Sequence, residues 1–278
     1  MPKLFVDNLT VIDFSYACPQ RGIVGASWIV DIVLEGGLDE QGMVFDFGNV
    51  KKTIKQHIDK HYDHKLWLNE SLPNFRRLLN GEERSYSWTN NEGEAYQHRS
   101  PTTAVLELDI DDIEHTLMTR HIEQSLVSLL PSNISAVGIT LRDEVIHGAN
   151  YCYTHGLQKH NGNCQRIAHG HRSRIEIARD GSRDAELEKT WADQWTDIYI
   201  ASFEHIVHSN IDTTQVKYQA PQGEFELWLP TRTVYIIETE STVENIASYL
   251  HQSIKAEFPR DTISVRAFEG VAKGAIAE

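Results

Sequence analysis

Apolar positions alternate with polar ones, or recur every three to four residues, along most of the first half of the chain. Residues 4–16 and 22–35 are rich in β-branched and aromatic residues, which is typical of strands, and Gly36-Gly37 ends the second run. The apolar residues after position 46 recur at spacings of three and four and so share one helix face: Phe47, Val50, Ile54 and Ile58. The predicted elements of this half are strands over 4–16 and 22–35, a helix over 46–60, a long polar loop over 70–103, a helix over 111–130 that Pro131 stops, and a strand over 134–142.

The same order of elements returns in the second half. The segment 172–178 alternates charged and apolar residues, as a half-buried strand does. The predicted elements are strands over 149–157 and 172–178, a helix over 184–195 and beyond, a polar loop over 209–226, a strand over 234–237, a helix over 244–258 and a strand over 262–268. Both halves therefore follow the order strand, strand, helix, loop, helix, strand, which predicts an internal repeat of about 135 residues.

Short local matches support the repeat, because they occur in the same order in both halves. The matched segments are Val24-Gly25-Ala26-Ser27 with His169-Gly170-His171-Arg172, residues 63–69 with residues 204–210, and residues 144–149 with residues 269–275. The second match aligns Asp63-His64 with Glu204-His205.

The composition is that of an ordinary globular protein, with 40% hydrophobic and 24% charged residues among 278. A net charge of −14 argues against nucleic acid or an anionic membrane as a partner, although a local basic pocket could still hold a phosphorylated small molecule. The sequence has no run of 18 apolar residues, and its start does not read as a signal peptide. Cys18, Cys152 and Cys164 cannot form a disulfide framework in so long a chain, so we expect a reduced, cytoplasmic protein.

Histidine is unusually frequent, with 14 residues, and three of these form a candidate metal site. His169 and His171 open a predicted strand, where residues two apart point to the same face and Gly170 adds no bulk between them. A hairpin with the preceding strand would bring His155 across to this pair. Three His ligands with an open fourth position are typical of catalytic rather than structural zinc. The alternative is that the His-x-His pair arose by chance in a His-rich chain.

Cys164 lies between His155 and His169 in a polar, turn-rich segment, which favours an accessible thiol. A nearby zinc ion and Arg166 would favour the thiolate, which is the reactive form. The alternative role is that of a fourth ligand in a closed structural site. We favour a nucleophile or base, because three histidines already suffice for the metal.

Two acidic positions are further candidates for chemistry. Asp63 directly precedes His64, and a carboxylate beside an imidazole can orient it and stabilise its protonated form for acid–base work. Glu144 ends a predicted strand and could bind an amino-substituted heterocycle through two charge-assisted hydrogen bonds. The alternatives are a solvated helix end for Asp63-His64 and a surface carboxylate for Glu144.

The order of these motifs resembles that of the 6-pyruvoyl-tetrahydropterin synthase / 6-carboxytetrahydropterin synthase family. The second half carries the family's His, Cys, His-Gly-His and Thr-x-Glu-Asn-x-Ala motifs at His155, Cys164, His169-Gly170-His171 and Thr242-Val243-Glu244-Asn245-Ile246-Ala247. The first half carries its Gly-Met-Val-x-Asp-Phe and Asp-His-x-x-Leu-Asn-like motifs and its strand-ending Glu at residues 42–47, residues 63–69 and Glu144. In the first half Cys18 stands where the first His belongs and Val24-Gly25-Ala26 replaces His-Gly-His, while in the second half the acid–base pair has changed to Glu204-His205.

This resemblance implies an α+β fold of two tandem tunnelling-fold units. Each unit is expected to be a four-stranded antiparallel sheet with two helices on one face, and the sheets are expected to join into a barrel in a homo-oligomer. Residues 1–146 would form a unit without metal ligands that supplies Asp63, His64 and Glu144. Residues 147–278 would form the unit that carries zinc and Cys164.

The resemblance also implies an activity, that of a zinc-dependent lyase acting on 7,8-dihydroneopterin triphosphate. His155, His169 and His171 would bind Zn²⁺. Cys164, with His64 oriented by Asp63, would move protons on the substrate side chain, and Glu144 would hold the pterin ring. The candidates for binding the triphosphate are Lys159, Arg166 and Arg172.

The resemblance leaves three functions open. The short gap between Cys164 and His169 favours a 6-carboxytetrahydropterin synthase, which starts the 7-deazaguanine and queuosine route. The alternatives are a 6-pyruvoyltetrahydropterin synthase, which eliminates triphosphate, and a protein that binds a pterin or purine without converting it. A zinc hydrolase fits less well, because the sequence has no His-Glu-x-x-His helix.

Overall fold

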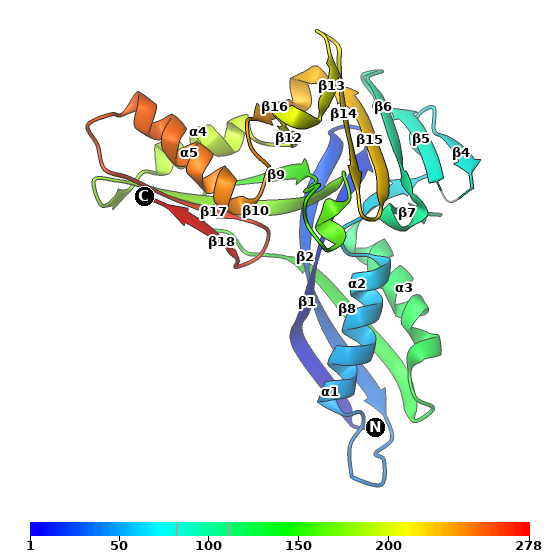
Figure 1. The fold of residues 1–278 in the computed structure, drawn as a ribbon. Helices are drawn as coiled ribbons and strands as arrows, with labels where there is room; N and C mark the ends of the chain where they lie inside the picture. The colour runs from blue at the N-terminus through cyan, green and yellow to red at the C-terminus, as the bar shows by residue number, and fades with distance from the viewer. Residues whose placement is uncertain (82, 111) are drawn as a thin grey trace.

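The computed structural model describes residues 1–81, 83–110 and 112–278, whose strands form three sheets (Figure 1). One sheet and its helices come from the first half of the chain, a second sheet and its helices come from the second half, and the third sheet takes strands from both. The predicted α+β class and tandem arrangement are therefore confirmed. The joining of sheets into a barrel stays a prediction.

The first unit is built on a long antiparallel hairpin. Its elements are β1 (Lys3–Cys18), β2 (Gly22–Gly36), β3 (Leu66–Asn69), β7 (Val105–Leu108), β8 (Ile134–Asp143), α1 (Phe47–Asn49), the π-helical turn η1 (Val50–Lys55), α2 (Gln56–His61), α3 (His115–Leu126), and the 3-10 turns η2 (Thr102–Ala104) and η3 (Val127–Leu129). The sheet has the order β7-β3-β1-β2-β8, in which β3 and β7 extend the antiparallel strands by parallel pairing. The helices bury one apolar stripe against this sheet: Val50, Ile54, Ile58, Met118, Ile122 and Leu126. Phe47, predicted to belong to that stripe, is exposed at the start of its helix.

The second unit repeats this plan. Its elements are β9 (Asn150–His155), β10 (His169–Arg179), β11 (Ser182–Arg183), β12 (Ile198–Ser202), β16 (Val234–Ile237), β17 (Ile263–Phe268), β18 (Gly274–Ala277), α4 (Ala185–Gln194), α5 (Val243–Glu257), and the 3-10 turns η4 (Asn163–Gln165), η5 (Phe203–His205) and η6 (Thr231–Thr233). The sheet order is β16-β12-β9-β10-β17-β18, and β11 pairs with β10. Thr242 caps the start of helix α5, because its Oγ1 accepts a hydrogen bond from the backbone N of Asn245. The helix buries Ile246, Leu250 and Ile254.

The third sheet shows that the two loop predictions, over 70–103 and over 209–226, were wrong. It consists of β4 (Arg76–Asn80), β5 (Glu83–Thr89), β6 (Ala95–Pro101), β13 (Ile206–Ser209), β14 (Thr213–Ala220) and β15 (Gly223–Pro230). The order β13-β14-β15-β6-β5-β4 joins the halves through the pairing of β15 with β6. The third sheet stands beside both units in Figure 1.

Strict alternation explains why these polar segments form strands. Tyr86, Trp88 and Tyr96 are buried, while Ser85 and Ser87, on either side of Tyr86, are half-buried on the opposite face. The same alternation buries Val216 and Tyr218 on β14 and Phe225, Leu227 and Leu229 on β15. One apolar residue in two is enough to bury one face of a sheet, so a polar average composition hid the signal.

Other element boundaries also differ from the sequence predictions. Residues 198–202 form β12, where the helix over 184–195 was expected to continue. The helix predicted over 111–130 begins at His115, and residue 111 lies outside the described residues. The short strands β3, β7 and β18 were not predicted.

The two units meet face to face at a pair of glycines. A Cβ on Gly25 would lie 2.0 Å from the carbonyl oxygen of Tyr153, and a Cβ on Gly170 would lie 2.6 Å from Cα of Gly25. Beside them, the hydroxyl oxygens of Ser15 and Thr154 are 2.8 Å apart. Only residues without a side chain allow this approach of the two backbones.

The strand registers correct two of the sequence matches. Gly25 pairs with Ser15, and the equivalent Gly170 pairs with Thr154, so the first-unit counterpart of His155 is Tyr16 rather than Cys18. Ser15 also pairs with Leu66, and Thr154 pairs with Tyr199. Counting back from these partners, the counterpart of Asp63-His64 is Thr196-Asp197 rather than Glu204-His205.

Backbone geometry supports this second correction. His64 and Asp197 both have positive φ, at 54° and 59°. The backbone N of His64 donates to the carbonyl oxygen of Asp13, and that of Asp197 donates to the carbonyl oxygen of Cys152, at 2.7 and 2.8 Å. Asp13 and Cys152 are themselves counterparts in the two hairpins.

Candidate functional site

Three buried imidazoles lie together at the end of the β9–β10 hairpin. His155 and His169 are paired residues of the two strands, and His171 lies two residues further along the same face. One ring nitrogen of each lies within 4.8 Å of the others, and all three side chains are fully buried. The hairpin thus brings together the three residues that the sequence analysis selected for a metal.

The outer nitrogen of each ring faces an oxygen atom. These contacts join Nδ1 of His155 to the carbonyl oxygen of Ser241 at 2.9 Å, Nδ1 of His169 to that of Arg166 at 2.9 Å, and Nδ1 of His171 to Oδ1 of Asp13 at 3.2 Å. The contact of His171 with Asp13 is an ion pair, because Nδ1 of His171 makes no hydrogen bond among the described residues. The inner Nε2 atoms point at one another, and Nε2 of His169 also has no hydrogen-bond partner among those residues. Burial, with the neighbouring imidazoles, holds the pKa of His155 and of His169 well below its ordinary value.

These features fit a bound divalent cation. Neutral imidazoles are metal ligands, and an oxygen on each outer nitrogen fixes the ring so that the inner lone pair faces the ion. A buried nitrogen without a partner costs free energy unless a ligand satisfies it. His155, His169 and His171 could therefore hold a metal ion with three nitrogen ligands and an open position.

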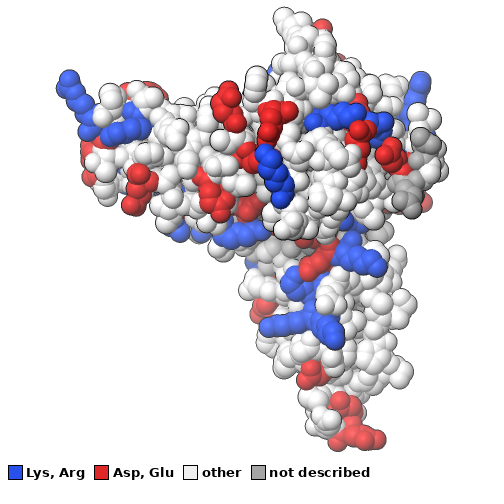
Figure 2. Space-filling model, viewed as in Figure 1, with Lys and Arg blue, Asp and Glu red and all other residues white. Residues whose placement is uncertain are grey.

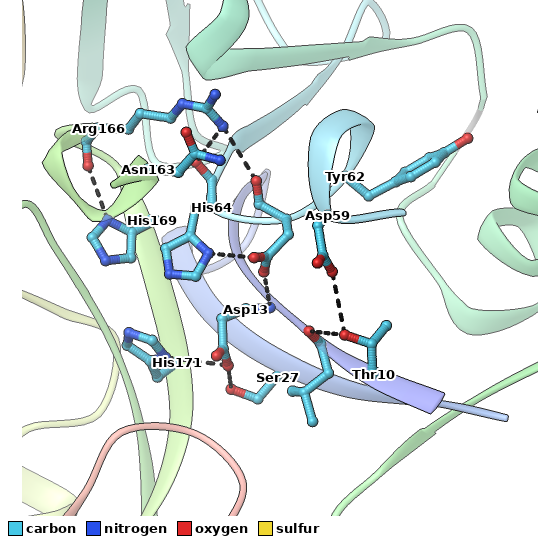
Figure 3. A network of polar contacts seen from close by, with 12 residues as sticks. Thr10, Asp13, Ser27, Asp59, Tyr62, His64, Asn163, Arg166, His169 and His171 are labelled. Carbon is cyan, nitrogen blue, oxygen red and sulfur yellow. Dashed lines mark hydrogen bonds and ion pairs between the residues drawn. The ribbon is translucent and has the colours of Figure 1, made fainter. Parts of the chain in front are cut away.

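The acid–base pair of the first unit reaches this cluster within the same chain. Asp63 and His64 follow α2, and Asp63 is fixed because its Oδ1 accepts from the backbone N of Asp13 at 2.8 Å. Oδ2 of Asp63 lies 2.6 Å from Nδ1 of His64. The His64 and His169 rings lie 4.9 Å apart between centroids (Figure 3).

The surroundings of His64 favour its protonated form. Burial acts to lower its pKa, but hydrogen bonds and charges from Asp63 and Cys164 outweigh burial and raise the pKa to about 10. A ligand nitrogen of His64, the sulfur of Cys164 and a nitrogen of His169 all lie within 4.8 Å of one another. A protonated imidazole is thus placed between a thiol and the candidate metal site.

The loop that carries Cys164 is held by the third sheet. The hydroxyl of Tyr218 donates to the carbonyl oxygen of Gln165 at 2.9 Å, and the backbone N of Gln222 donates to Oε1 of Gln165 at 2.7 Å. The side-chain amide of Gln222 donates to Oδ1 of Asn163 at 2.9 Å. Because β14 and β15 were not predicted, sequence reasoning missed these supports.

The side chains of the predicted substrate-binding residues lie around the cluster, although the backbone carbonyl of Arg166 contacts His169. Lys159 is exposed and pairs with Glu204 at 2.8 Å. Arg166 donates to the carbonyl oxygens of Asp63 and His64 at 3.3 Å, which ties the Cys164 loop to the first unit. Arg172 donates to the carbonyl oxygen of Glu144 at 2.9 Å, and the carboxylate of Glu144 lies 3.5 Å from Arg174.

Another carboxylate, that of Glu269, does reach the histidines. Its Oε1 lies 3.6 Å from Nε2 of His171 and 4.0 Å from Nε2 of His155. Glu269 follows β17, so the signal for it was again a glutamate at the end of a strand. The strand registers make Asp143, not Glu144, its first-unit counterpart.

Because the two units are duplicates, the paired hairpins have a second position equivalent to that of the three histidines. Among the described residues, that position holds no comparable set of metal ligands. The counterparts of the three histidines there are Tyr16, Val24 and Ala26. Asp197, the counterpart of His64, instead forms a two-point ion pair with Arg21, at 2.6 and 2.7 Å. Within the described ranges, no group of possible metal ligands gathers at that place.

One more acidic group, formed by Glu204, His205 and Glu240, lies elsewhere on the second unit. Lys159 lies 2.8 Å from Glu204 and 3.7 Å from Glu240, so one lysine offsets part of the charge of the two carboxylates. Over the face in Figure 2, basic and acidic side chains are interspersed. In the part of the chain that the structure describes, no helix has the length and apolar character needed to cross a membrane.

Comparisons with known proteins agree with the motif order. A family model described as 6-pyruvoyl tetrahydropterin synthase matches residues 14–124 and 144–278. No curated protein matches the chain. Among solved structures, a catalytic-residue mutant of Plasmodium vivax 6-pyruvoyltetrahydropterin synthase is 15% identical over 51% of this chain and 90% of that chain, with a TM-score of 0.41. The Plasmodium falciparum 6-pyruvoyl tetrahydropterin synthase is 18% identical over 50% and 90%, with a TM-score of 0.40.

The TM-scores of these structural likenesses are too low to carry an argument, whereas the family model matches most of the chain, once in each unit. The chain therefore belongs to the 6-pyruvoyl tetrahydropterin synthase family, in a form with two tandem units.

Proposed function

We propose that the chain is a zinc-dependent lyase that acts on 7,8-dihydroneopterin triphosphate, as a 6-carboxytetrahydropterin synthase. The observation that carries this proposal is the meeting of His64, Cys164 and His169 within 4.8 Å, in a family whose members act on pterins. Membership alone supports a pterin lyase. The three roles of metal ligand, thiol and acid–base pair in one place support catalysis rather than binding alone.

Zinc, held by His155, His169 and His171, would act as a Lewis acid toward the side-chain oxygens of the substrate. The residues of the chain would move the protons. Cys164, as thiolate, would accept a proton from the substrate side chain, and His64 would donate or take up a proton at the same centre. Asp63 would keep the His64 ring oriented through its hydrogen bond to Nδ1.

The pterin ring and the triphosphate would bind around this centre. Glu144 stays the predicted partner of the amino and N–H edge of the ring, and Glu269 is a second candidate because it lies closer to the histidines. Lys159, Arg166 and Arg172 stay the predicted triphosphate ligands. Each would have to exchange a present contact for the phosphate.

The alternative product is 6-pyruvoyltetrahydropterin, formed by elimination of triphosphate. Both reactions start with proton transfer on the hydroxylated side chain, and they diverge at the bond that breaks. Cleavage of a carbon–carbon bond, together with loss of triphosphate and addition of one water molecule, would release acetaldehyde and leave a carboxylated pterin. Product analysis therefore separates the two activities, and formation of neither product would support a binding protein.

The experiment is incubation of the zinc-loaded protein with 7,8-dihydroneopterin triphosphate, followed by mass spectrometry of the products. Cys164→Ala should abolish turnover while zinc stays bound, and Cys18→Ala is the matched control that should keep activity. Both thiols are partly exposed, but Cys18 does not belong to the group formed by His64, Cys164 and His169. Turnover by Cys164→Ala would exclude the thiol role, and absence of both products with the wild type would exclude the lyase.

We also propose that the protein is a homo-oligomer. Strand β8 pairs only with β2, and β18 pairs only with β17, so each described unit leaves an edge strand open. Natural proteins usually pair or cover such edges. Light scattering of the purified protein would give the oligomer mass.

A further inference from the structure

A buried carboxylate of the first unit contacts a histidine of the second unit. Asp13 lies on β1, is 2% exposed, and its Oδ1 is 3.2 Å from Nδ1 of His171. The same carboxylate accepts a hydrogen bond from the hydroxyl of Ser27 at 2.5 Å, and its Oδ2 lies 3.0 Å from Nζ of Lys273. Figure 3 shows Asp13 between Ser27 and His171.

The surrounding chain is shaped to this carboxylate. Gly270 has φ of +69°, and a Cβ at that position would lie 2.5 Å from Oδ1 of Asp13 and 2.8 Å from the hydroxyl oxygen of Ser27. A side chain there would therefore clash with both partners. The turn from Gly270 to Lys273, in the second unit, thus closes over an acidic residue of the first.

The duplication provides an internal comparison. By the strand registers, the counterpart of Asp13 is Cys152, that of Ser27 is Arg172, and that of His171 is Ala26. A carboxylate required only to pack the two hairpins would be expected on both sides of the paired units. Here it occurs only on the side where a candidate metal ligand faces it.

Burying an ionised carboxylate costs free energy unless hydrogen-bond or ion-pair partners satisfy its oxygens. In metal sites, a carboxylate that accepts from one imidazole nitrogen fixes the tautomer and turns the other nitrogen to the ion. Removing such an outer partner typically weakens metal binding about 10- to 100-fold. The 3.2 Å ion pair between Asp13 and His171 places a carboxylate beside the outer nitrogen of a ring whose inner nitrogen faces the cluster.

We propose that Asp13 is a positioning residue for the metal site: the first unit fixes His171 of the second unit and thereby sets its affinity for zinc. This inference deepens the proposed function and rests on it only in requiring that the histidines bind metal. Ser27 and Lys273 hold the carboxylate in place. The first unit therefore contributes to metal binding although it has no ligand of its own in the cluster.

The test compares the zinc affinity of the full-length wild type with that of two variants, by competition with a chromophoric chelator. Asp13→Asn is nearly isosteric and should raise the dissociation constant for zinc about 10- to 100-fold. Ser15→Ala is the matched control, because Ser15 is also buried between the units but contacts Thr154 rather than a histidine. It should bind zinc as the wild type does.

Cobalt(II) absorption gives a readout that a purely structural role would not move. The visible bands of the cobalt-loaded protein should change in Asp13→Asn and stay the same in Ser15→Ala. If Asp13→Asn does not fold, Asp13→Ser, which also lacks the carboxylate, should show the same loss of affinity.

Wild-type affinity in a folded Asp13 variant would overturn the proposal, as would an equal loss in Ser15→Ala, because the effect would then come from the interface. A wild type that binds neither zinc nor cobalt would instead refute the metal site and the proposed function together. A wild type that binds zinc tightly but forms no pterin product would refute the lyase and leave the Asp13 test intact.

Discussion

Replacing Gly25 with alanine should separate the two units and damage the site between them. The added Cβ would lie 2.0 Å from the carbonyl oxygen of Tyr153 and 2.7 Å from the backbone N of His171. Ordinary carbon–oxygen contacts begin at roughly 3.3 Å, so one hairpin would have to move by about 1 Å. Backbone atoms on a paired strand cannot rotate away as a flexible side chain could.

The expected cost follows from this geometry. Overpacking of a close-packed interior costs about 1–3 kcal/mol, and the clash with two backbone atoms places this change at the upper end of that range. A shift of about 1 Å would also lengthen the 3.2 Å ion pair between Asp13 and His171 to roughly 4 Å and so weaken it. We therefore expect Gly25→Ala to lower both the free energy of unfolding and the affinity for zinc.

Urea unfolding monitored by tryptophan fluorescence measures the first effect, and chelator competition measures the second. Gly138→Ala is the matched control, because a Cβ there would meet only one atom, at 3.9 Å. It should change the free energy of unfolding by less than about 0.5 kcal/mol. Equal stability of Gly25→Ala and wild type would refute the argument that the units need this close approach.

Three further predictions concern one buried group of the third sheet and two groups around the site. His98 is buried in the third sheet, and burial lowers its pKa to about 3. As the pH falls below about 6.5, the unfolded chain binds a proton that the folded chain does not, so the free energy of unfolding should decrease. From pH 7 to pH 5 the wild type should lose about 2 kcal/mol more of this free energy than His98→Leu in urea titrations, and equal losses would contradict the assignment. Asp63→Asn removes one of the two groups that raise the pKa of His64, so the alkaline limb of the pH profile of kcat should move to lower pH. An unmoved limb would show that His64 is not the titrating acid. Gln222→Ala removes a side-chain hydrogen bond to the Cys164 loop, so it should lower kcat several-fold at unchanged zinc affinity. Gln219 is exposed, and Gln219→Ala should behave as the wild type. Equal kcat values for the two variants would show that the β14–β15 hairpin does not hold the Cys164 loop for catalysis.

The sequence allowed prediction of the parts of the fold whose signal is local. The periodicity of Val50, Ile54 and Ile58 predicted the first helix, and the β-branched run of residues 22–35 predicted β2. The loops over 70–103 and 209–226 were mispredicted because burying one face of a strand needs only alternate apolar residues, such as Tyr86 and Trp88. Their pairing through β15 and β6 links residues more than 120 positions apart, which no local pattern encodes.

The residues of the candidate site also differ in whether a local sequence pattern could predict them. His-x-His on one strand and Asp63-His64 in one turn are local patterns, and the structure brings them together. Asp13 carried no signal, because its partner His171 lies in the other unit. The match of Asp63-His64 to Glu204-His205 was wrong because residue identity guided it, whereas strand register and a positive φ point to Thr196-Asp197.

A mixing experiment tests most directly whether one chain alone completes the site. His64→Ala and Cys164→Ala each remove one member of the group formed by His64, Cys164 and His169, and the two residues come from different units. The two inactive variants would be unfolded together, refolded so that mixed oligomers form, and assayed with 7,8-dihydroneopterin triphosphate. We expect no recovery of turnover, because every chain in the mixture still carries a defect in its own site. Recovery of a substantial fraction of wild-type activity would show that the thiol and the acid–base pair come from different chains, so that no chain completes the site alone.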